Sequence, residues 1–263
     1  MDLGLSGRAA IVTGASRGIG RAIALALATE GCHVAVCGRD EAALDGVVAG
    51  IEAMGAQAIG VAAELSNDSA AELIAGRCLD AFGRLDVLVN NAGGAAPKPL
   101  DQLTAVDWQE GIDLNFMTAA RMSVACLPAM RAAGWGRIVH VASVSGREPD
   151  PLFAPYSAAK AALLNLSTSL SRAYAAEGVL SSCVVPGVTI TELVEANAAA
   201  TAERTGSSAE DVMARLLAKQ GVAAGRFGTP EEIAAAVVFL ASEQAAWITG
   251  ATLEVDGGTL RST

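Results

Sequence analysis

A tyrosine and a lysine stand four residues apart in an alanine-rich segment that reads YSAAK over residues 156–160. Residues with this spacing lie on the same face of an α-helix, so a helix here holds the Tyr156 phenol close to the Lys160 ammonium. A free phenol has a pKa of about 10 and is a poor base at neutral pH. A nearby positive charge favours the phenolate and lowers that pKa. The pair therefore predicts an acid–base centre in which Lys160 tunes Tyr156.

A glycine-rich segment, TGASRGIG over residues 13–20, lies between a short apolar run and a helical pattern. Gly14, Gly18 and Gly20 allow a tight turn, and the free N–H groups at the start of the next helix then face a phosphate. A glycine-rich turn without a ligand is the alternative interpretation. The strand before the glycines and the helix after them are the context that dinucleotide binding requires, and they favour the phosphate site.

Short apolar runs alternate with longer helical patterns along the chain. The runs predicted as buried strands are 8–14, 33–39, 57–65, 85–93, 137–143, 179–187 and 251–258. The predicted helices are 20–31, 40–55, 67–83, 104–133, 155–177 and 230–242. Apolar strands that alternate with helices indicate a parallel sheet covered by helices on both faces. Right-handed crossovers make this a doubly wound, Rossmann-type α/β fold of about seven strands.

The same order of segments predicts a single domain over residues 1–263, because no linker rich in Pro, Gly or Ser divides the chain. Residues 189–228 interrupt the alternation with a polar, alanine-rich helical segment. It follows the sixth predicted strand, so it should hang over the carboxyl ends of the strands, where ligands bind in such folds. This insertion is predicted to be a lid over the substrate.

Composition excludes several classes of function. Hydrophobic residues make up 52% of the chain, which allows a large core, and the formal net charge of -10 disfavours nucleic acids and anionic membranes as partners. The five cysteines lack metal-ligand spacing and are predicted to be buried thiols, and both histidines stand beside valines in apolar runs, so no metal site is expected. No secretory signal or membrane-spanning run is visible, which predicts a cytoplasmic protein.

Five motifs resemble, in their order along the chain, the short-chain dehydrogenase/reductase family in its compact single-domain form. They are TGASRGIG at 13–20, NNAG at 90–93, Ser143, YSAAK at 156–160 and PG at 186–187. The resemblance covers nearly the whole chain and implies an NAD(P)-dependent oxidoreductase. It implies that Tyr156 is the acid or base and that Lys160 also binds the nicotinamide ribose.

The resemblance extends the expected catalytic group to Ser143 and Asn115. Ser143 would hold the substrate oxygen, and Asn115 would bend its helix and bind a water molecule that relays protons through Lys160. The expected catalytic residues are therefore Asn115, Ser143, Tyr156 and Lys160. Taken singly, Ser143 is also explained as the cap of a turn, and Asn115 as a satisfied polar residue within a helix.

The resemblance also implies a set of cofactor contacts. The residues expected to contact the nicotinamide dinucleotide are Gly14, Ser16, Arg17, Gly18, Ile19, Gly20, Arg39, Glu64, Leu65, Asn91, Ala92, Gly93, Tyr156, Lys160, Pro186, Gly187, Val188 and Thr191. The NNAG and PG segments are also explained as turns that support the sheet, and both roles are compatible. Most relatives have Asp where Glu64 stands.

The end of the second predicted strand bears on the choice of cofactor. NAD-binding proteins of this fold usually hold the ribose hydroxyls with an acidic residue there. Gly38 stands at this place, and Arg39 follows it. Together with Arg17, Arg39 can hold a 2′-phosphate through charge-assisted hydrogen bonds. NADP(H) is therefore the expected cofactor, with NAD as the alternative, since Asp40 can also turn toward the ribose or pair with Arg39.

The expected reaction is hydride transfer from NADPH to a ketone, or its reversal. The predicted substrate contacts are Ser143, Leu152, Tyr156, Leu193 and Val194. Their apolar members favour a hydrophobic or 3-oxoacyl-type substrate. The carboxyl-terminal segment resembles that of 3-oxoacyl-[acyl-carrier-protein] reductases and of many related dehydrogenases, so it does not select a substrate.

Alternatives for the function, for the form of the substrate and for the assembly remain open. The chain is also compatible with an NAD-dependent sugar, steroid or polyol dehydrogenase, or with a non-catalytic cofactor sensor. A carrier protein is acidic and needs a basic patch, for which Arg121, Arg131 and Arg172 are the candidates. A free small molecule or a coenzyme A ester fits the sparse positive charge as well. The long apolar helices resemble those that pack between subunits of a homotetramer or homodimer.

Overall fold

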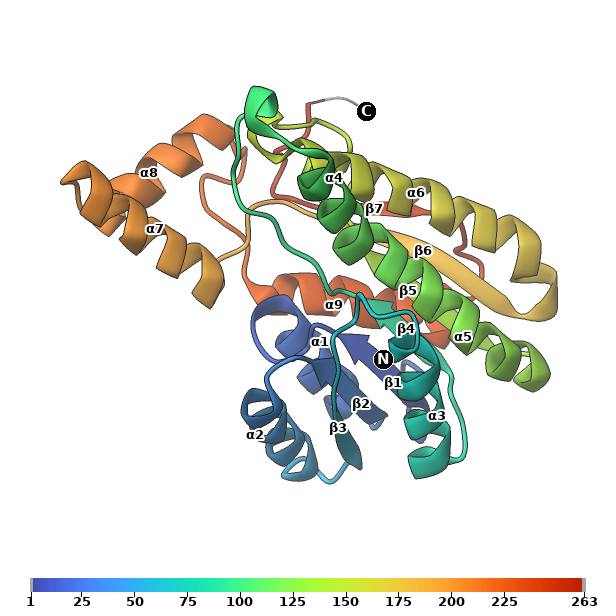
Figure 1. Ribbon diagram of the computed structural model, residues 1–263. Helices are drawn as coiled ribbons and strands as arrows, with labels where there is room; N and C mark the ends of the chain where they lie inside the picture. Colours follow the sequence, from blue (N-terminus) through green and yellow to red (C-terminus); the bar gives the residue numbers. More distant parts are fainter. Residues whose placement is uncertain (1, 262–263) are drawn as a thin grey trace.

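The computed structural model describes residues 2–261. Seven parallel strands form one sheet in the order β3-β2-β1-β4-β5-β6-β7 (Figure 1). The strands are β1 (Ala9–Thr13), β2 (His33–Gly38), β3 (Ala58–Ala62), β4 (Val87–Asn90), β5 (Gly136–Val141), β6 (Val179–Pro186) and β7 (Thr252–Val255). The predicted doubly wound α/β fold is confirmed. The strand order reverses between β1 and β4, and a crevice for ligands opens at such a point.

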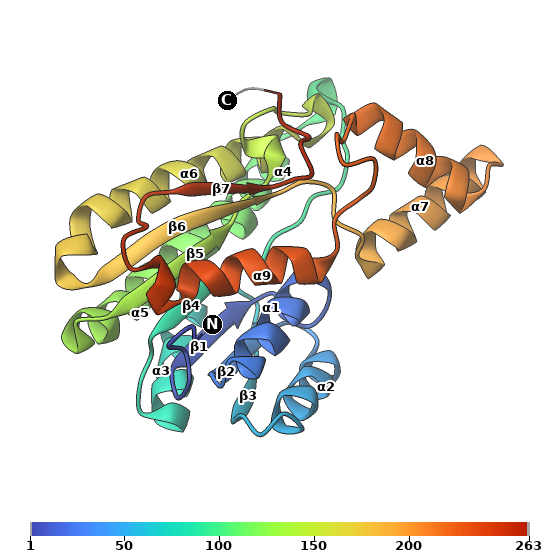
Figure 2. The ribbon, with the colours of Figure 1, turned by 180° about the vertical axis from the view of Figure 1, so that it is seen from behind.

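Helices cover both faces of the sheet (Figures 1 and 2). One face packs under α1 (Gly18–Thr29), α2 (Glu41–Glu52) and α9 (Pro230–Ala241). The other packs under α3 (Ala70–Phe82), α5 (Thr118–Ala133) and α6 (Ala154–Tyr174). Side chains alternate between the faces along a strand, so Val12 of β1 joins the first core and Ile11 the second. This double burial explains why the strands are continuous apolar runs.

The helix predicted over 104–133 is interrupted. Helix α4 (Ala105–Ile112) passes into a π-helical turn over Asp113–Met117, and α5 follows. Within this turn Asn115 is buried, and its amide bonds the backbone of Gly94 and Gly111 outside the usual helical pattern. Such a π-turn inserts one residue into the helical ladder and re-aims a side chain. The structure therefore departs from a regular α-helix at Asn115, where a bend was expected.

The segment predicted as a lid forms two helices, α7 (Glu192–Thr205) and α8 (Ala209–Gln220). Thr191 and Ser208 accept hydrogen bonds from backbone N–H groups of the first turns and so cap these helices. The helix pair projects beyond the carboxyl end of β6, away from the body of the sheet (Figures 1 and 2). Among residues 2–261, no helix is both long and apolar enough to cross a bilayer.

Candidate active site

The glycine turn after β1 is tight and lies close to the NNAG segment at the end of β4. Gly14 and Gly18 have positive φ angles of 63° and 55°, a region that glycine adopts without strain. A Cβ atom on Gly14 would lie 2.8 Å from the Cα of Ala92, and one on Gly20 would collide with the Gly14 carbonyl oxygen. Within the described chain, Arg17 precedes α1 without a side-chain cap, so the first N–H groups of the helix stay free for an anion.

The NNAG segment holds this turn in place. The Asn91 amide donates hydrogen bonds to the carbonyl oxygens of Thr13 and Gly14 at 2.9 and 3.0 Å. The Thr13 hydroxyl in turn accepts from the backbone N–H groups of Asn91 and Ala92, both at 2.9 Å. The ends of β1 and β4 are therefore cross-linked. The supporting role expected for this segment is present, and Asn91 and Gly93 also line the central cavity.

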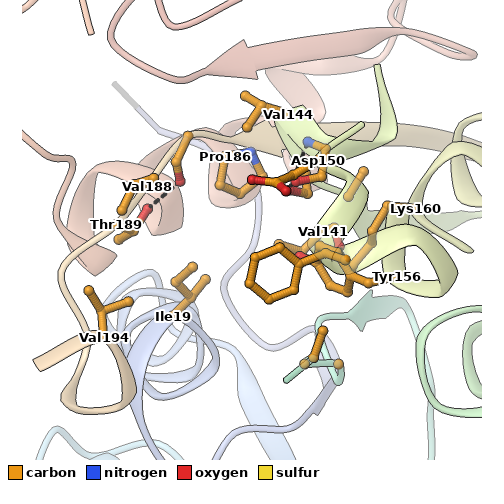
Figure 3. A pocket seen from close by; sticks show the side chains of 18 of the residues that line it. Ile19, Val141, Val144, Asp150, Tyr156, Lys160, Pro186, Val188, Thr189 and Val194 are labelled. Atoms are coloured by element: carbon orange, nitrogen blue, oxygen red, sulfur yellow. Dashed lines mark hydrogen bonds between the residues drawn. The ribbon is translucent and has the colours of Figure 1, made fainter. Parts of the chain in front are cut away.

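Tyr156 and Lys160 lie on one face of α6, at the carboxyl end of β5 (Figure 3). The Lys160 Nζ atom lies 5.6 Å from the centre of the Tyr156 ring. It donates a hydrogen bond of 2.7 Å to the carbonyl oxygen of Val141, the last residue of β5. Ser143, two residues further along, is hydrogen-bonded to Tyr156. The strand end thus carries both the acceptor that anchors Lys160 and the hydroxyl that contacts Tyr156.

Burial sets the protonation of this pair. Burial raises the pKa of the Tyr156 phenol above its usual value, and the hydrogen bond from Ser143 opposes this only in part. The lowered pKa expected from Lys160 is therefore wrong for the protein without cofactor, because the ammonium is directed at Val141 rather than at the phenol. Burial also lowers the pKa of Lys160 to about 8. Lys160 is cationic at neutral pH and close to its titration.

Asn115 joins the centre through Gly93. A Cβ atom on Gly93 would lie 2.6 Å from Asn115 Oδ1 and 3.3 Å from Lys160 Nζ, so only glycine leaves room for both groups. Asn115 also accepts from the N–H of Gly94 at 2.9 Å. The structure therefore brings together all four residues of the expected catalytic group, from the π-turn, the end of β5 and helix α6.

The ends of β2 and β3 lie beside the glycine turn and outside the central cavity. Arg39 is 78% exposed, and its guanidinium lies 4.0 Å from Glu64, so it is available to a ligand. Asp40 caps α2 by accepting from the N–H of Ala43, which removes it from the alternatives of facing the ribose or pairing with Arg39. A Cβ atom on Gly38 would lie 3.8 Å from Ser16 Oγ, an ordinary contact distance.

Leu65 differs from the other residues expected at this end. Its side chain is only 7% exposed and belongs to the core under α3 and α5. Its carbonyl oxygen accepts from the Thr118 hydroxyl. The side chain of Leu65 is therefore part of the packing, and its carbonyl oxygen is engaged within the protein.

The central cavity has a volume of about 1080 Å³ and runs from the glycine turn past Tyr156 to the lid. Ile19 of α1 and Val194 of α7 lie across it from Tyr156 and Lys160 (Figure 3). Of the other expected contacts, it is lined by Gly14, Arg17, Gly18, Gly20, Asn91, Gly93, Ser143, Leu152, Pro186, Gly187, Val188, Thr191 and Leu193. Ser16, Arg39, Glu64, Leu65, Ala92 and Asn115 are outside its lining.

Further residues that line the cavity come from the predicted lid and from the chain end. Helix α8 contributes Leu216 and Lys219, and the chain end contributes Leu260 and Arg261. Lys219 forms an ion pair of 3.3 Å with Asp150, another residue that lines the cavity. The residues of the chain end gave no sequence signal, because they lie more than a hundred positions after Tyr156 and reach the cavity only through the fold.

These features fit a dinucleotide. A helix start without a capping side chain, next to Gly14 and Gly20 where a Cβ atom would collide with backbone, leaves room and N–H donors for a pyrophosphate. Thr191 lies next to Gly18, whose Cβ position is 3.2 Å from the Thr191 methyl group. The cavity then continues from this phosphate site to Tyr156, so one extended molecule can span both.

Comparison with known proteins agrees with this site. The chain matches the short chain dehydrogenase family over residues 8–202. It is 39% identical over 256 residues to the 3-oxoacyl-[acyl-carrier-protein] reductase of Synechocystis sp., with 97% of each chain covered. The crystal structure of L-sorbose reductase from Gluconobacter frateurii, complexed with NADPH and L-sorbose, superposes with a TM-score of 0.96 at 31% identity, covering both chains fully. YwfH, an NADPH-dependent reductase involved in bacilysin biosynthesis, gives 0.90 at 29% identity over 97% of this chain and 99% of its own.

The fold and the site define a dinucleotide-binding oxidoreductase with a tyrosine–lysine pair. The chain belongs to the short-chain dehydrogenase family and acts on CH–OH groups, with a nucleotide cofactor and a small-molecule substrate.

Proposed function

We propose that this protein is an NADP(H)-dependent reductase that converts a hydrophobic or 3-oxoacyl-type ketone to a secondary alcohol. The observation that carries the proposal is the convergence of Ser143, Tyr156 and Lys160 in one cavity that extends to the glycine turn. Nucleophilic catalysis has less support, because the five cysteines are all buried.

The proposed chemistry divides between the cofactor and the chain. When bound, the nicotinamide supplies or takes up the hydride. Ser143 holds the carbonyl oxygen of the substrate by a hydrogen bond, and Tyr156 transfers its phenolic proton to that oxygen. Lys160 stabilises the phenolate that this leaves, and Asn115 fixes the chain at Gly94 beside Lys160. Alcohol oxidation uses the same groups in the opposite direction.

The protonation of Tyr156 favours the reductive direction at neutral pH. Because burial raises its pKa, the phenol keeps its proton in the resting site. A proton donor is what ketone reduction needs, whereas alcohol oxidation first requires the phenolate. Because burial lowers the pKa of Lys160 to about 8, its stabilising charge is lost above about that pH.

The preference for NADP(H) rests on the charges at the end of β2. Arg39 is exposed and Asp40 is engaged as a helix cap, while Gly38 presents no carboxylate to the ribose. Arg17 lies at the start of α1 and lines the central cavity. Two guanidinium groups without a competing acid at residue 38 suit a 2′-phosphate. Two similar structures are described with NADPH or as NADPH-dependent.

The substrate end of the cavity supports an apolar ligand with a polar end. Leu152, Leu193, Val194 and Leu216 provide apolar surface, and residues 189–228 act as the lid. A carrier protein as the donor of the acyl group has weaker support. Arg121 is paired with Asp68 at 2.7 Å and Arg131 with Glu177 at 2.6 Å, so most of the candidate basic patch is neutralised.

The second candidate is a sugar or polyol dehydrogenase of the same family. Lys219, Asp150 and Gln220 line the outer part of the cavity and can bond hydroxyl groups. The likeness to a sorbose reductase supports this alternative. A non-catalytic cofactor sensor has less support, since the chain keeps both Tyr156 and Lys160 and they lie in one cavity.

The test is a panel of 3-oxoacyl esters, apolar ketones and ketoses, followed at the NADPH absorbance band. The change Tyr156→Phe should lower kcat at least a thousandfold for whichever ketone is reduced, since it removes the proton donor, and should leave NADPH binding intact. Tyr174, the only other tyrosine, lies on the far part of α6, and Tyr174→Phe is the matched control that should keep full activity. Retained turnover in Tyr156→Phe would refute the assignment.

A further inference from the structure

A buried polar cluster lies behind the catalytic lysine, on the face of the sheet covered by α5 and α6. It consists of Asn90 at the end of β4, His140 in β5 and Ser123 in α5, which are 3%, 0% and 0% exposed. Asn90 and His140 are paired in register across the two strands. The Asn90 Nδ2 atom lies 3.2 Å from Ser123 Oγ and 3.3 Å from His140 Nδ1. Neither the cofactor nor the substrate contacts proposed above include this cluster.

The hydrogen bonds fix every proton in the cluster. The Ser123 hydroxyl donates to the carbonyl oxygen of Ala119 at 2.7 Å, so toward Asn90 it can only accept. The facing atom of Asn90 must then be its NH₂ group, whose two protons go to Ser123 and to His140. His140 Nδ1 therefore accepts, and the imidazole is the neutral tautomer with its proton on Nε2. A second proton on Nδ1 would face the Asn90 donor.

This tautomer matters because His140 is a neighbour of the catalytic cation. Burial lowers the pKa of His140 to about 3, and the charge of Lys160 contributes to the same shift. The ionisable groups that face the imidazole are Lys160 from α6 and Cys183, its register partner on β6. From β4 and α5 it faces the uncharged Asn90 and Ser123. The imidazole of His140 is therefore uncharged at neutral pH, where Lys160 carries its charge.

The position of His140 in β5 connects the cluster to the reacting groups. The next residue, Val141, supplies the carbonyl oxygen that binds Lys160 Nζ at 2.7 Å. Ser143 follows two positions later. We propose that His140 is a positioning residue: anchored to Asn90 and Ser123 as the neutral Nε2–H imidazole, it fixes the end of β5 that holds Lys160 and Ser143, and it excludes a second cation from beside Lys160. The expected effect of His140 on catalysis rests on the proposed function.

Two atoms of the cluster have no protein partner among residues 2–261, Asn90 Oδ1 and His140 Nε2. A buried polar atom without a hydrogen bond is costly, so these two atoms mark places where ordered water can bind within the interior. Ser157, on the same side of α6 as Lys160, carries a third such atom and is 4% exposed. The polar interior around Lys160 therefore extends well behind the residues that face the cavity.

The first test compares two substitutions of similar effect on packing. His140→Leu fills the space but leaves the Asn90 amide without its acceptor. We expect kcat for the best ketone to fall about ten- to a hundredfold, because a small displacement of reacting groups lowers the rate strongly. His140→Asn keeps an acceptor near the position of Nδ1 and should stay within about threefold of the unchanged protein. KM for the ketone should change little in both, since neither substitution touches the substrate cavity. Thermal unfolding and NADPH binding show that each variant is folded.

The second test reads the tautomer in the unchanged protein. The chain has two histidines, so the imidazole nitrogen resonances of His140 are assigned by loss of the His33 signals in His33→Gln. The expected result is a neutral Nε2–H ring whose shifts stay constant from about pH 5 to 9. An Nδ1–H tautomer, or titration within that range, would overturn the proposal even if His140→Leu fails to fold. So would a folded His140→Leu with unchanged kcat.

The two failures are distinguishable. If the unchanged protein reduces no ketone in the panel, the proposed function fails while the resonance test still reports on the tautomer. If it reduces a ketone and His140→Leu does so equally well, only the positioning role fails.

Discussion

At the end of β2, Gly38 leaves space beside Ser16 that a larger side chain can occupy. Its Cβ position is 3.8 Å from both Ser16 Oγ and Leu44 Cδ2, and its φ angle is not positive, so substitution brings no backbone strain. A carboxylate at residue 38 would bind ribose hydroxyls and repel a 2′-phosphate. We therefore expect a carboxylate at residue 38 to shift the preference between the two nicotinamide cofactors.

We expect Gly38→Asp to lower the ratio of kcat/KM with NADPH to kcat/KM with NADH by about ten- to a hundredfold, the range of one charge-assisted hydrogen bond gained or lost. Gly38→Ala is the control for added bulk alone and should leave the ratio nearly unchanged. Steady-state kinetics with both cofactors measures it. Equal loss with both cofactors in Gly38→Asp would contradict the argument.

The buried ammonium of Lys160 predicts how reduction depends on pH. With a pKa of about 8, Lys160 carries its charge at neutral pH and loses it above that value. The neutral amine no longer stabilises the phenolate that forms when Tyr156 gives up its proton. The reductive kcat should therefore be level from about pH 6 to 7.5 and decline as the pH rises through about 8. A profile that stays level to pH 10 would show that this charge is dispensable.

At the scale of elements, the lid brings a carboxylate to the phosphate site. Glu192, the first residue of α7, lines the cavity, and one of its oxygens is 3.6 Å from the Cβ position of Gly18. The glycine turn is where the pyrophosphate is proposed to bind, so we expect the carboxylate of Glu192 to repel it and to weaken cofactor binding.

We expect Glu192→Gln to lower the Kd for NADPH by about two- to fivefold, a modest gain because the repulsion is solvent-exposed and screened. Glu195, one turn later on the same helix, lies outside the cavity lining, and Glu195→Gln should leave the Kd unchanged. Fluorescence titration of NADPH at low and high salt measures both. The gain in NADPH affinity of Glu192→Gln should shrink at high salt. Equal gains in both variants would show a general effect of net charge and contradict a specific role of Glu192.

At the scale of the whole molecule, an ionic cluster stabilises the amino ends of β1 and β4, at the end of the sheet opposite the active site. Asp86 is 1% exposed and accepts hydrogen bonds from Arg84 at 2.6 and 2.8 Å, from Arg8 at 3.2 Å and from the N–H of Ala9 at 2.8 Å. Burial raises the pKa of Asp86, but these hydrogen bonds outweigh it and leave the pKa lowered. The cluster ties the chain start to the entry of β4.

A lowered folded-state pKa means that Asp86 stabilises the fold above its unfolded pKa of about 3.9, and that this stabilisation is lost as the pH falls through the folded-state value. We expect Asp86→Asn to lower the free energy of unfolding at pH 7 by about 2–3 kcal/mol. Asp107, a surface carboxylate bonded to Lys98, is the matched control, and Asp107→Asn should lose less. Urea unfolding at pH 7 and pH 4 measures this, and a loss in Asp86→Asn that is no larger than in Asp107→Asn would contradict it.

Assembly and location stay predictions. Exposed apolar side chains occur on α4 and α5, at Val106 and Val124, and near the chain end at Trp247, which is 99% exposed. They are compatible with the homotetramer or homodimer expected from the sequence and do not decide between these. The cytoplasmic location likewise stays an expectation.

Much of the fold could be predicted from the sequence because strands buried on both faces must be continuous apolar runs, and each predicted run overlaps an observed strand. The catalytic pair was visible because helical spacing alone places Tyr156 and Lys160 on one face. The interruption at Asn115 was expected from the family resemblance, and its form, a π-turn, came from tertiary contacts with Gly94 and Gly111.

The sequence by itself determined the fold class, the glycine turn, the catalytic pair and the absence of an acid at residue 38, because each depends on local spacing or on one residue type. Only the tertiary structure decided what surrounds these groups. In the structure, Lys160 donates to the carbonyl oxygen of Val141, and burial raises rather than lowers the pKa of Tyr156. Asp40 is a helix cap, and Lys219 and Arg261 line the cavity. Burial and contacts between distant segments control these properties, and neither is encoded in local spacing.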